Sequence, residues 1–167
     1  THAGLDALTV YGTQLFWPFT PPPVSGGSVF IIDPIYSAAL LAGFIAVLLW
    51  PERRRSDKIM RYGFAFSCVY LLWGFGAQHW IAAQTERALA KQNIQYENMQ
   101  VSATAFNTLL WRMIVVGDDY YYEGFRSLFD DGQKITFRRY NRGGELIEKT
   151  RALPAFQRID WFTNGLF

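Results

Sequence analysis

The sequence predicts a membrane protein of the α+β class, in which a helical transmembrane hairpin is followed by a small antiparallel β-sheet domain with a flanking helix. Two observations predict the hairpin: residues 34–50 carry no charge, and residues 59–82 form a second long, mostly apolar run. A helix of about 20 apolar residues spans a bilayer. A third observation predicts the sheet, because apolar and polar residues begin to alternate after Gln95.

The first unit, residues 1–33, contains a short motif-bearing segment and a loop rich in proline and glycine. Three consecutive prolines at 21–23 favour an extended chain, and the two adjacent glycines that follow favour a turn. The glycine spacing matches neither a phosphate-binding nor a dinucleotide-binding motif. Asp33 is a good N-cap for the next helix, and Pro34 is a good first residue within it.

The second unit, residues 34–82, contains two predicted membrane spans, at 34–50 and 59–82, joined by a strongly basic loop at 51–58. Short basic loops of membrane proteins stay in the cytoplasm. The tip of the hairpin is therefore expected to face the cytoplasm, and the N-terminal motif and the C-terminal domain are expected to be extracytoplasmic. This topology predicts a multi-pass protein of the bacterial cytoplasmic (inner) membrane.

The third unit, residues 83–167, is predicted to form the extracytoplasmic domain. It opens with strong helix formers that continue the second helix to about residue 92. Turn signals at residues 130–132 and 141–144 separate segments with the period of strands. The predicted strands cover residues 99–103, 110–116, 120–128 and 135–140, and a short amphipathic helix covers residues 153–162.

Composition excludes several classes of function. The 167 residues carry a net charge of only +2 and show neither a basic stripe nor a zinc-knuckle or helix-turn-helix signature, so we expect no nucleic-acid partner. The only cysteine, Cys68, cannot form a disulfide within the chain and is expected to be a packed thiol.

The N-terminal segment offers the candidate chemistry. His2 and Asp6 are four residues apart, which places them on one face of a helix, where an imidazole and a carboxylate can share a divalent metal. The alternative is that His2 forms an ordinary hydrogen bond and that Asp6 is solvated. Asp33 is a candidate third ligand, a candidate general base, or only the cap of the helix that it precedes.

The residues that follow His2 and Asp6 carry a longer sequence motif. The stretch His2–Phe19, followed by Phe30–Tyr36, resembles the YdjM-like family of membrane-bound, metal-dependent hydrolases. Two segments in the C-terminal half, Phe106–Arg112 and Trp161–Gly165, also resemble that family. The resemblance covers most of the chain, and its first motif is specific.

The resemblance implies a site and a chemistry. His2 and Asp6 would ligate a divalent metal, expected to be zinc, with manganese or iron as alternatives. Asp33 would be the catalytic residue, and the resemblance assigns substrate binding to Thr9, Tyr11 and Gln14. The expected substrate is a phosphoester or a lipid-like small molecule at the outer face of the membrane, so membrane lipid is the expected partner.

The chain also departs from the family pattern. Family members carry an H-R-G-x-T-H motif upstream of this pair, and it is not in the sequence. We therefore expect a fragment that lacks part of the metal site. The alternative function is a non-catalytic, membrane-anchored module whose extracytoplasmic β domain binds a partner or an envelope component.

Overall fold

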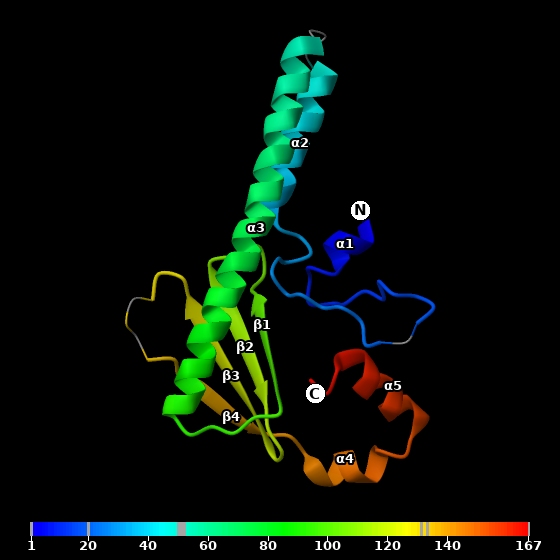
Figure 1. Ribbon diagram of the computed structural model, residues 1–167, viewed down its shortest axis with the longest axis vertical. Helices are drawn as coiled ribbons and strands as arrows, with labels where there is room; N and C mark the ends of the chain where they lie inside the picture. The colour runs from blue at the N-terminus through cyan, green and yellow to red at the C-terminus, as the bar shows by residue number, and fades with distance from the viewer. Residues whose placement is uncertain (1, 20, 50–52, 131, 133, 167) are drawn as a thin grey trace.

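A computed structural model describes residues 2–19, 21–49, 53–130, 132 and 134–166, and it divides into a helical hairpin and a sheet-containing part (Figure 1). Helix α2 (Pro34–Leu49) packs antiparallel to the first half of α3 (Arg53–Lys91), and this pair stands away from the sheet at the top of the view, whereas the second half of α3 runs over the sheet. The sheet contains β1 (Asn98–Ala103), β2 (Leu110–Val116), β3 (Tyr120–Ser127) and β4 (Phe137–Asn141). Three short helices complete the fold: α1 (His2–Asp6), α4 (Gly144–Thr150) and α5 (Pro154–Thr163).

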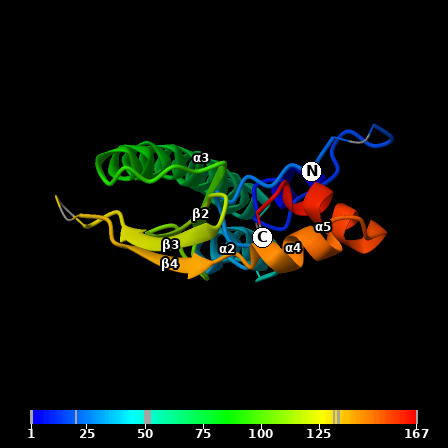
Figure 2. The same ribbon diagram turned by 90° about the horizontal axis from the view of Figure 1, so that it is seen from below.

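The sheet is antiparallel, with its four strands in the order β1-β2-β3-β4. Successive side chains of a strand point to opposite faces, which explains why Trp111, Met113 and Val115 are fully buried whereas Leu110 before them and Arg112 among them are exposed. The buried face packs against the C-terminal half of α3, where Ala77 and Ile81 join the core. Seen from below, α3 lies over one face of the sheet, while α4 and α5 lie beside the sheet (Figure 2).

The four strand predictions are confirmed to within two residues at each end. Residue 131, in the predicted turn at 130–132, lies outside the described residues. The helix predicted at 153–162 forms as α5. The predicted flanking helix, α5, lies beside the sheet, and the helix that packs on its face is α3. The turn at Asn141 also leads into α4, which the sequence did not predict; Gly143 adopts a left-handed φ of 74° there and donates its N–H to Oδ1 of Asn141.

The predicted transmembrane hairpin is wrong. Among the described residues, no helix is both long enough and apolar enough to cross a membrane. Helix α2 is apolar but has 16 residues, and a helix of that length rises roughly 24 Å against a hydrocarbon core of about 30 Å. Helix α3 has 39 residues, but glycine, serine, tyrosine and charged residues dilute its apolar stretches.

Small residues instead make α2 and α3 a closely packed pair. A Cβ on Gly63 would lie 2.5 Å from the carbonyl oxygen of Ala39, and one on Gly43 would lie 3.1 Å from Cα of Met60. Only glycine permits this approach of the two backbones. The second helix also begins at Arg53 rather than at residue 59, so most of the predicted basic loop is the first turns of α3; residues 50–52 lie outside the described part of the chain.

Candidate functional site

The N-terminal segment folds back on itself through backbone hydrogen bonds. The N–H of Gly26 donates to the carbonyl of Ala7 at 2.7 Å, and the N–H of Ser28 donates to the carbonyl of Leu8 at 2.8 Å. A Cβ on Gly26 would lie 2.8 Å from the oxygen of Ala7, so glycine is required at this crossing. These bonds hold α1 beside the start of α2, at the right of Figure 1.

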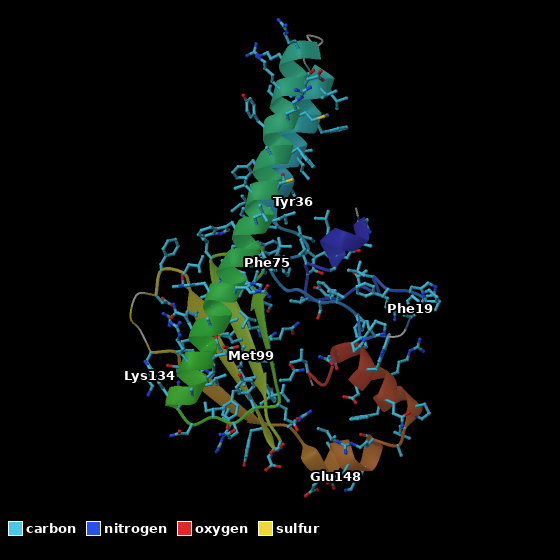
Figure 3. All side chains as sticks on the ribbon, in the orientation of Figure 1. Phe19, Tyr36, Phe75, Met99, Lys134 and Glu148 are labelled. Atoms are coloured by element: carbon cyan, nitrogen blue, oxygen red, sulfur yellow. The ribbon has the colours of Figure 1, made fainter. Side chains whose placement is uncertain are left out.

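An open pocket of about 510 Å³ lies between α1, the following turn and the base of the helical hairpin. Its polar lining includes His2, Asp6, Thr9, Tyr11, Thr13 and Tyr36, the last of which is labelled in Figure 3. Apolar side chains, including Val29, Phe30 and Leu71, supply much of the remaining wall. The structure therefore brings together four of the six predicted site residues, and Gln14 and Asp33 do not line this pocket.

The predicted pair lies side by side on α1. Nδ1 of His2 is 3.3 Å from Oδ2 of Asp6, with 92% of the His2 side chain and 38% of the Asp6 side chain exposed. This spacing fits two donors that share one cation, because an imidazole nitrogen and a carboxylate oxygen are both zinc ligands. In the described part of the chain, however, no group of three or more His, Cys, Asp or Glu side chains gathers around a common point.

Thr9 supports this pair through the backbone. Its side chain is buried, and its hydroxyl donates to the carbonyl oxygen of Asp6 at 2.7 Å. Its hydroxyl oxygen also accepts the N–H of Tyr11 at 3.4 Å. Thr9 therefore closes the turn that follows α1 and fixes the relative positions of Asp6 and Tyr11.

Asp33 belongs to a separate, buried network. Its Oδ1 accepts the backbone N–H groups of Ile35 at 2.9 Å and Tyr36 at 3.1 Å, so it caps α2 as one reading of the sequence proposed. Its Oδ2 accepts the hydroxyl of Tyr70 at 2.8 Å. The Tyr70 oxygen in turn accepts the hydroxyl of Thr108 at 3.2 Å, which links α2, α3 and the approach to β2.

This buried environment raises the pKa of the Tyr70 hydroxyl. Burial raises the pKa of Tyr70 to about 12, because it disfavours the phenolate; the hydrogen bond from Thr108 opposes that rise, and the hydrogen bond and negative charge of Asp33 add to it. Sequence reasoning missed Tyr70, which is 37 residues from Asp33 and is one of several aromatic residues in an apolar run. No local signal could have identified it.

Gln78 is a second residue that sequence reasoning missed. From the middle of α3 its Nε2 donates to the carbonyl oxygens of Gly26 and of Val101, the latter at 2.7 Å. Gly27 reinforces the junction, because its carbonyl accepts the N–H of Ala103 at 2.9 Å. The loop behind the pocket is thereby attached both to α3 and to the edge strand β1.

One protein-family model matches the part of the chain that contains this pocket. Residues 1–81 match the sequence model of one family, described as YdjM inner membrane protein. The match includes α1, α2 and the first part of α3, and so contains every residue that lines the pocket. No curated protein and no solved structure matches the chain.

Proposed function

Because the chain belongs through residues 1–81 to the YdjM inner membrane protein family, we propose that the protein is a membrane-associated, metal-dependent hydrolase. Its expected substrates are phosphoesters or lipid-like molecules. The observation that carries the proposal is the pocket beside α1, which presents His2 and Asp6 3.3 Å apart at its polar side.

In this proposal, His2 and Asp6 supply two protein ligands to a divalent metal, zinc in the first instance. Such a metal polarises a phosphoester and activates water when bound. Since a zinc site uses three or four protein ligands, further donors have to come from outside the described residues or from another molecule. Thr9 positions Asp6 through the backbone, and Tyr11, whose side chain is 56% exposed, is available to contact substrate.

Asp33 has a different role in this arrangement. Both of its carboxylate oxygens accept hydrogen bonds from within the fold, and its side chain is almost fully buried. A general base has to reach the proton that it removes, and this carboxylate lies outside the lining of the pocket. The geometry favours the cap, and general-base catalysis by Asp33 stays a prediction.

Exposed apolar side chains support the membrane location. Trp17 and Phe19, in the loop between the bridged residues Thr13 and Val24, are 74% and 75% exposed. Figure 3 labels Phe19 at the far end of this loop. Leu48 and Leu49 at the end of α2 are each 67% exposed. Aromatic residues are favoured at the interface between membrane and water.

The test is the metal content of the purified chain, measured by mass spectrometry after incubation with zinc and desalting. We expect about one zinc per chain, lost in the double variant His2→Ala/Asp6→Ala. Hydrolysis of a chromogenic phosphodiester should fall with it. The matched control is His79→Ala/Asp160→Ala, which removes the same two side-chain types at exposed positions outside the pocket. Equal zinc content in wild type and both variants would contradict the proposal.

The second candidate function is a membrane-associated binding module without catalysis. One observation favours it: among the described residues, the candidate ligands in the pocket are only two, fewer than a zinc site needs. Absence of zinc from the wild-type chain, together with unchanged folding of the His2→Ala/Asp6→Ala variant, would support this second function.

A further inference from the structure

A second, larger cleft lies on the opposite side of α3, between its C-terminal turns and the chain that connects β3 to β4. Its volume is about 930 Å³. Figure 3 labels Lys134 in this connection, at the left of the view. None of the residues that line the cleft lines the pocket beside α1.

The lining of this cleft is strongly basic. It contains four cationic side chains and one carboxylate, that of Asp130. The cations are Arg87, Lys91, Arg126 and Lys134. In the part of the chain that the structure describes, Arg87, Lys91 and Lys134 form no ion pair. The cleft therefore carries an excess of positive charge that an anion would offset.

Three of these cations occupy positions where a positive charge is unfavourable to the fold. Arg87 and Lys91 are four residues apart on α3, so they share one face, where like charges destabilise a helix. Arg126 is only 7% exposed although it is charged, and its Nη2 donates to the carbonyl oxygen of Asp130 at 3.0 Å. Asp130 also uses its carboxylate within the turn, where Oδ2 accepts the N–H of Ser127 at 2.8 Å.

An apolar groove of about 470 Å³ continues from this cleft along α3. Trp80 and Leu128 line both the cleft and the groove, so the two hollows share a wall. Leu72, Trp73, Gly76 and Ala77 supply the rest of the groove lining. A Cβ placed on Gly76 would meet no atom within 4 Å, which shows that the groove is open at this point.

We propose that the basic cleft and the apolar groove together bind one anionic phospholipid molecule. The phosphate lies among Arg87, Lys91 and Lys134, and an acyl chain lies along the groove past Trp80. Charge complementarity selects the anionic headgroup, because a zwitterionic one brings its own cation into a site that already has four. The continuous apolar wall favours a lipid over a free phosphate, because only the lipid removes that surface from water.

The test is lipid binding by the whole chain in mild detergent, followed by native mass spectrometry. The two probes are phosphatidylglycerol and phosphatidylcholine with the same acyl chains. We expect retention of phosphatidylglycerol in preference to phosphatidylcholine. The double variant Arg87→Gln/Lys91→Gln should bind phosphatidylglycerol roughly thirty-fold more weakly, as the loss of two cations near an anionic lipid implies. Lys149→Gln/Arg158→Gln removes the same charge from α4 and α5 and should leave binding unchanged.

The groove is tested separately with Gly76→Leu, which adds an apolar side chain to the groove at a position where a Cβ meets no atom within 4 Å. This variant should lose the advantage of long acyl chains over short ones. Gly144→Leu is the control, because a Cβ at Gly144 also meets nothing within 4 Å and this residue lies outside the groove. Equal binding of both lipids, or undiminished binding by Arg87→Gln/Lys91→Gln, would overturn the proposal. So would displacement of the lipid by inorganic phosphate with no effect of chain length. Each outcome is independent of zinc binding at His2.

Discussion

The hydroxyl of Tyr70 donates a hydrogen bond of 2.8 Å to Oδ2 of Asp33. Through this one bond the middle of α3 holds the residue that caps α2. Thr108, which precedes β2, donates to the same Tyr70 oxygen and so ties the hairpin to the sheet. A carboxylate that is almost fully buried needs such partners, because burial of an unpaired charge is strongly unfavourable.

Replacement of Tyr70 by phenylalanine should destabilise the fold by about 1–3 kcal/mol, because it leaves one oxygen of the buried Asp33 without its donor. The free energy of unfolding in urea measures this effect. Tyr62→Phe is the matched control, since Tyr62 is on the same helix and 75% exposed. Equal stabilities of the two variants would show that the hydrogen bond contributes nothing.

Stability should depend on alkaline pH through the same residue. The pKa of Tyr70 is raised to about 12 in the folded chain, chiefly by burial, against about 10 in an unfolded chain. A raised pKa means that the fold favours the neutral phenol. The stabilisation is therefore complete below about pH 10 and is lost as the pH rises toward about 12. The urea midpoint of the wild type should fall more steeply across this range than that of Tyr70→Phe, and parallel curves would contradict the assignment.

The contact between α2 and α3 should be sensitive to one methyl group. Gly63→Ala places a Cβ 2.5 Å from the oxygen of Ala39, and such overpacking typically costs about 1–3 kcal/mol. Gly76→Ala on the same helix meets no atom and should instead stabilise the chain by roughly 0.5–1 kcal/mol, because alanine is the better helix former. Thermal unfolding of the two variants should shift in opposite directions. A shift in the same direction would contradict the close approach of the helices.

Thr9→Val should loosen the turn after α1 without changing the charge of the pocket. The variant keeps the shape of the side chain but removes the hydroxyl that donates to Asp6 and accepts from Tyr11. Amide hydrogen exchange at Tyr11 should become faster, and zinc affinity should fall without being abolished. Thr163→Val, which removes a similar hydroxyl bond in α5, should leave both quantities unchanged. Unaltered exchange at Tyr11 would show that Thr9 does not hold the turn.

The sheet could be predicted because its information is local. In β2, a short run of aliphatic and aromatic residues favours a strand, and Arg112, exposed between the buried Trp111 and Met113, marks its outward face. The proximity of His2 and Asp6 was predictable for the same reason, since i, i+4 spacing on a helix fixes their separation. The substrate-binding assignments for Thr9 and Tyr11 stay predictions, although both residues line the pocket.

The features that the sequence did not predict depend on contacts between residues that are far apart in the chain. The two apolar runs were interpreted as membrane spans from their composition. In the structure, α2 has only 16 residues, and α3 is long but contains too many polar residues to cross a membrane. Asp33 and Tyr70 meet across 37 residues, and the donations from Gln78 to Gly26 and Val101 join three elements. Those pairings arise only when α3 packs, and no periodicity in the sequence encodes them.

Helix α3 is continuous over 39 residues, from the tip of the hairpin to the far end of the sheet. At about 1.5 Å per residue it is a rod of roughly 58 Å. Its upper half packs against α2 and its lower half packs on one face of the sheet (Figure 1). Because one unbroken helix contacts both α2 and the sheet, we expect any tilt of the hairpin to be transmitted along that helix to the strands that pack on it.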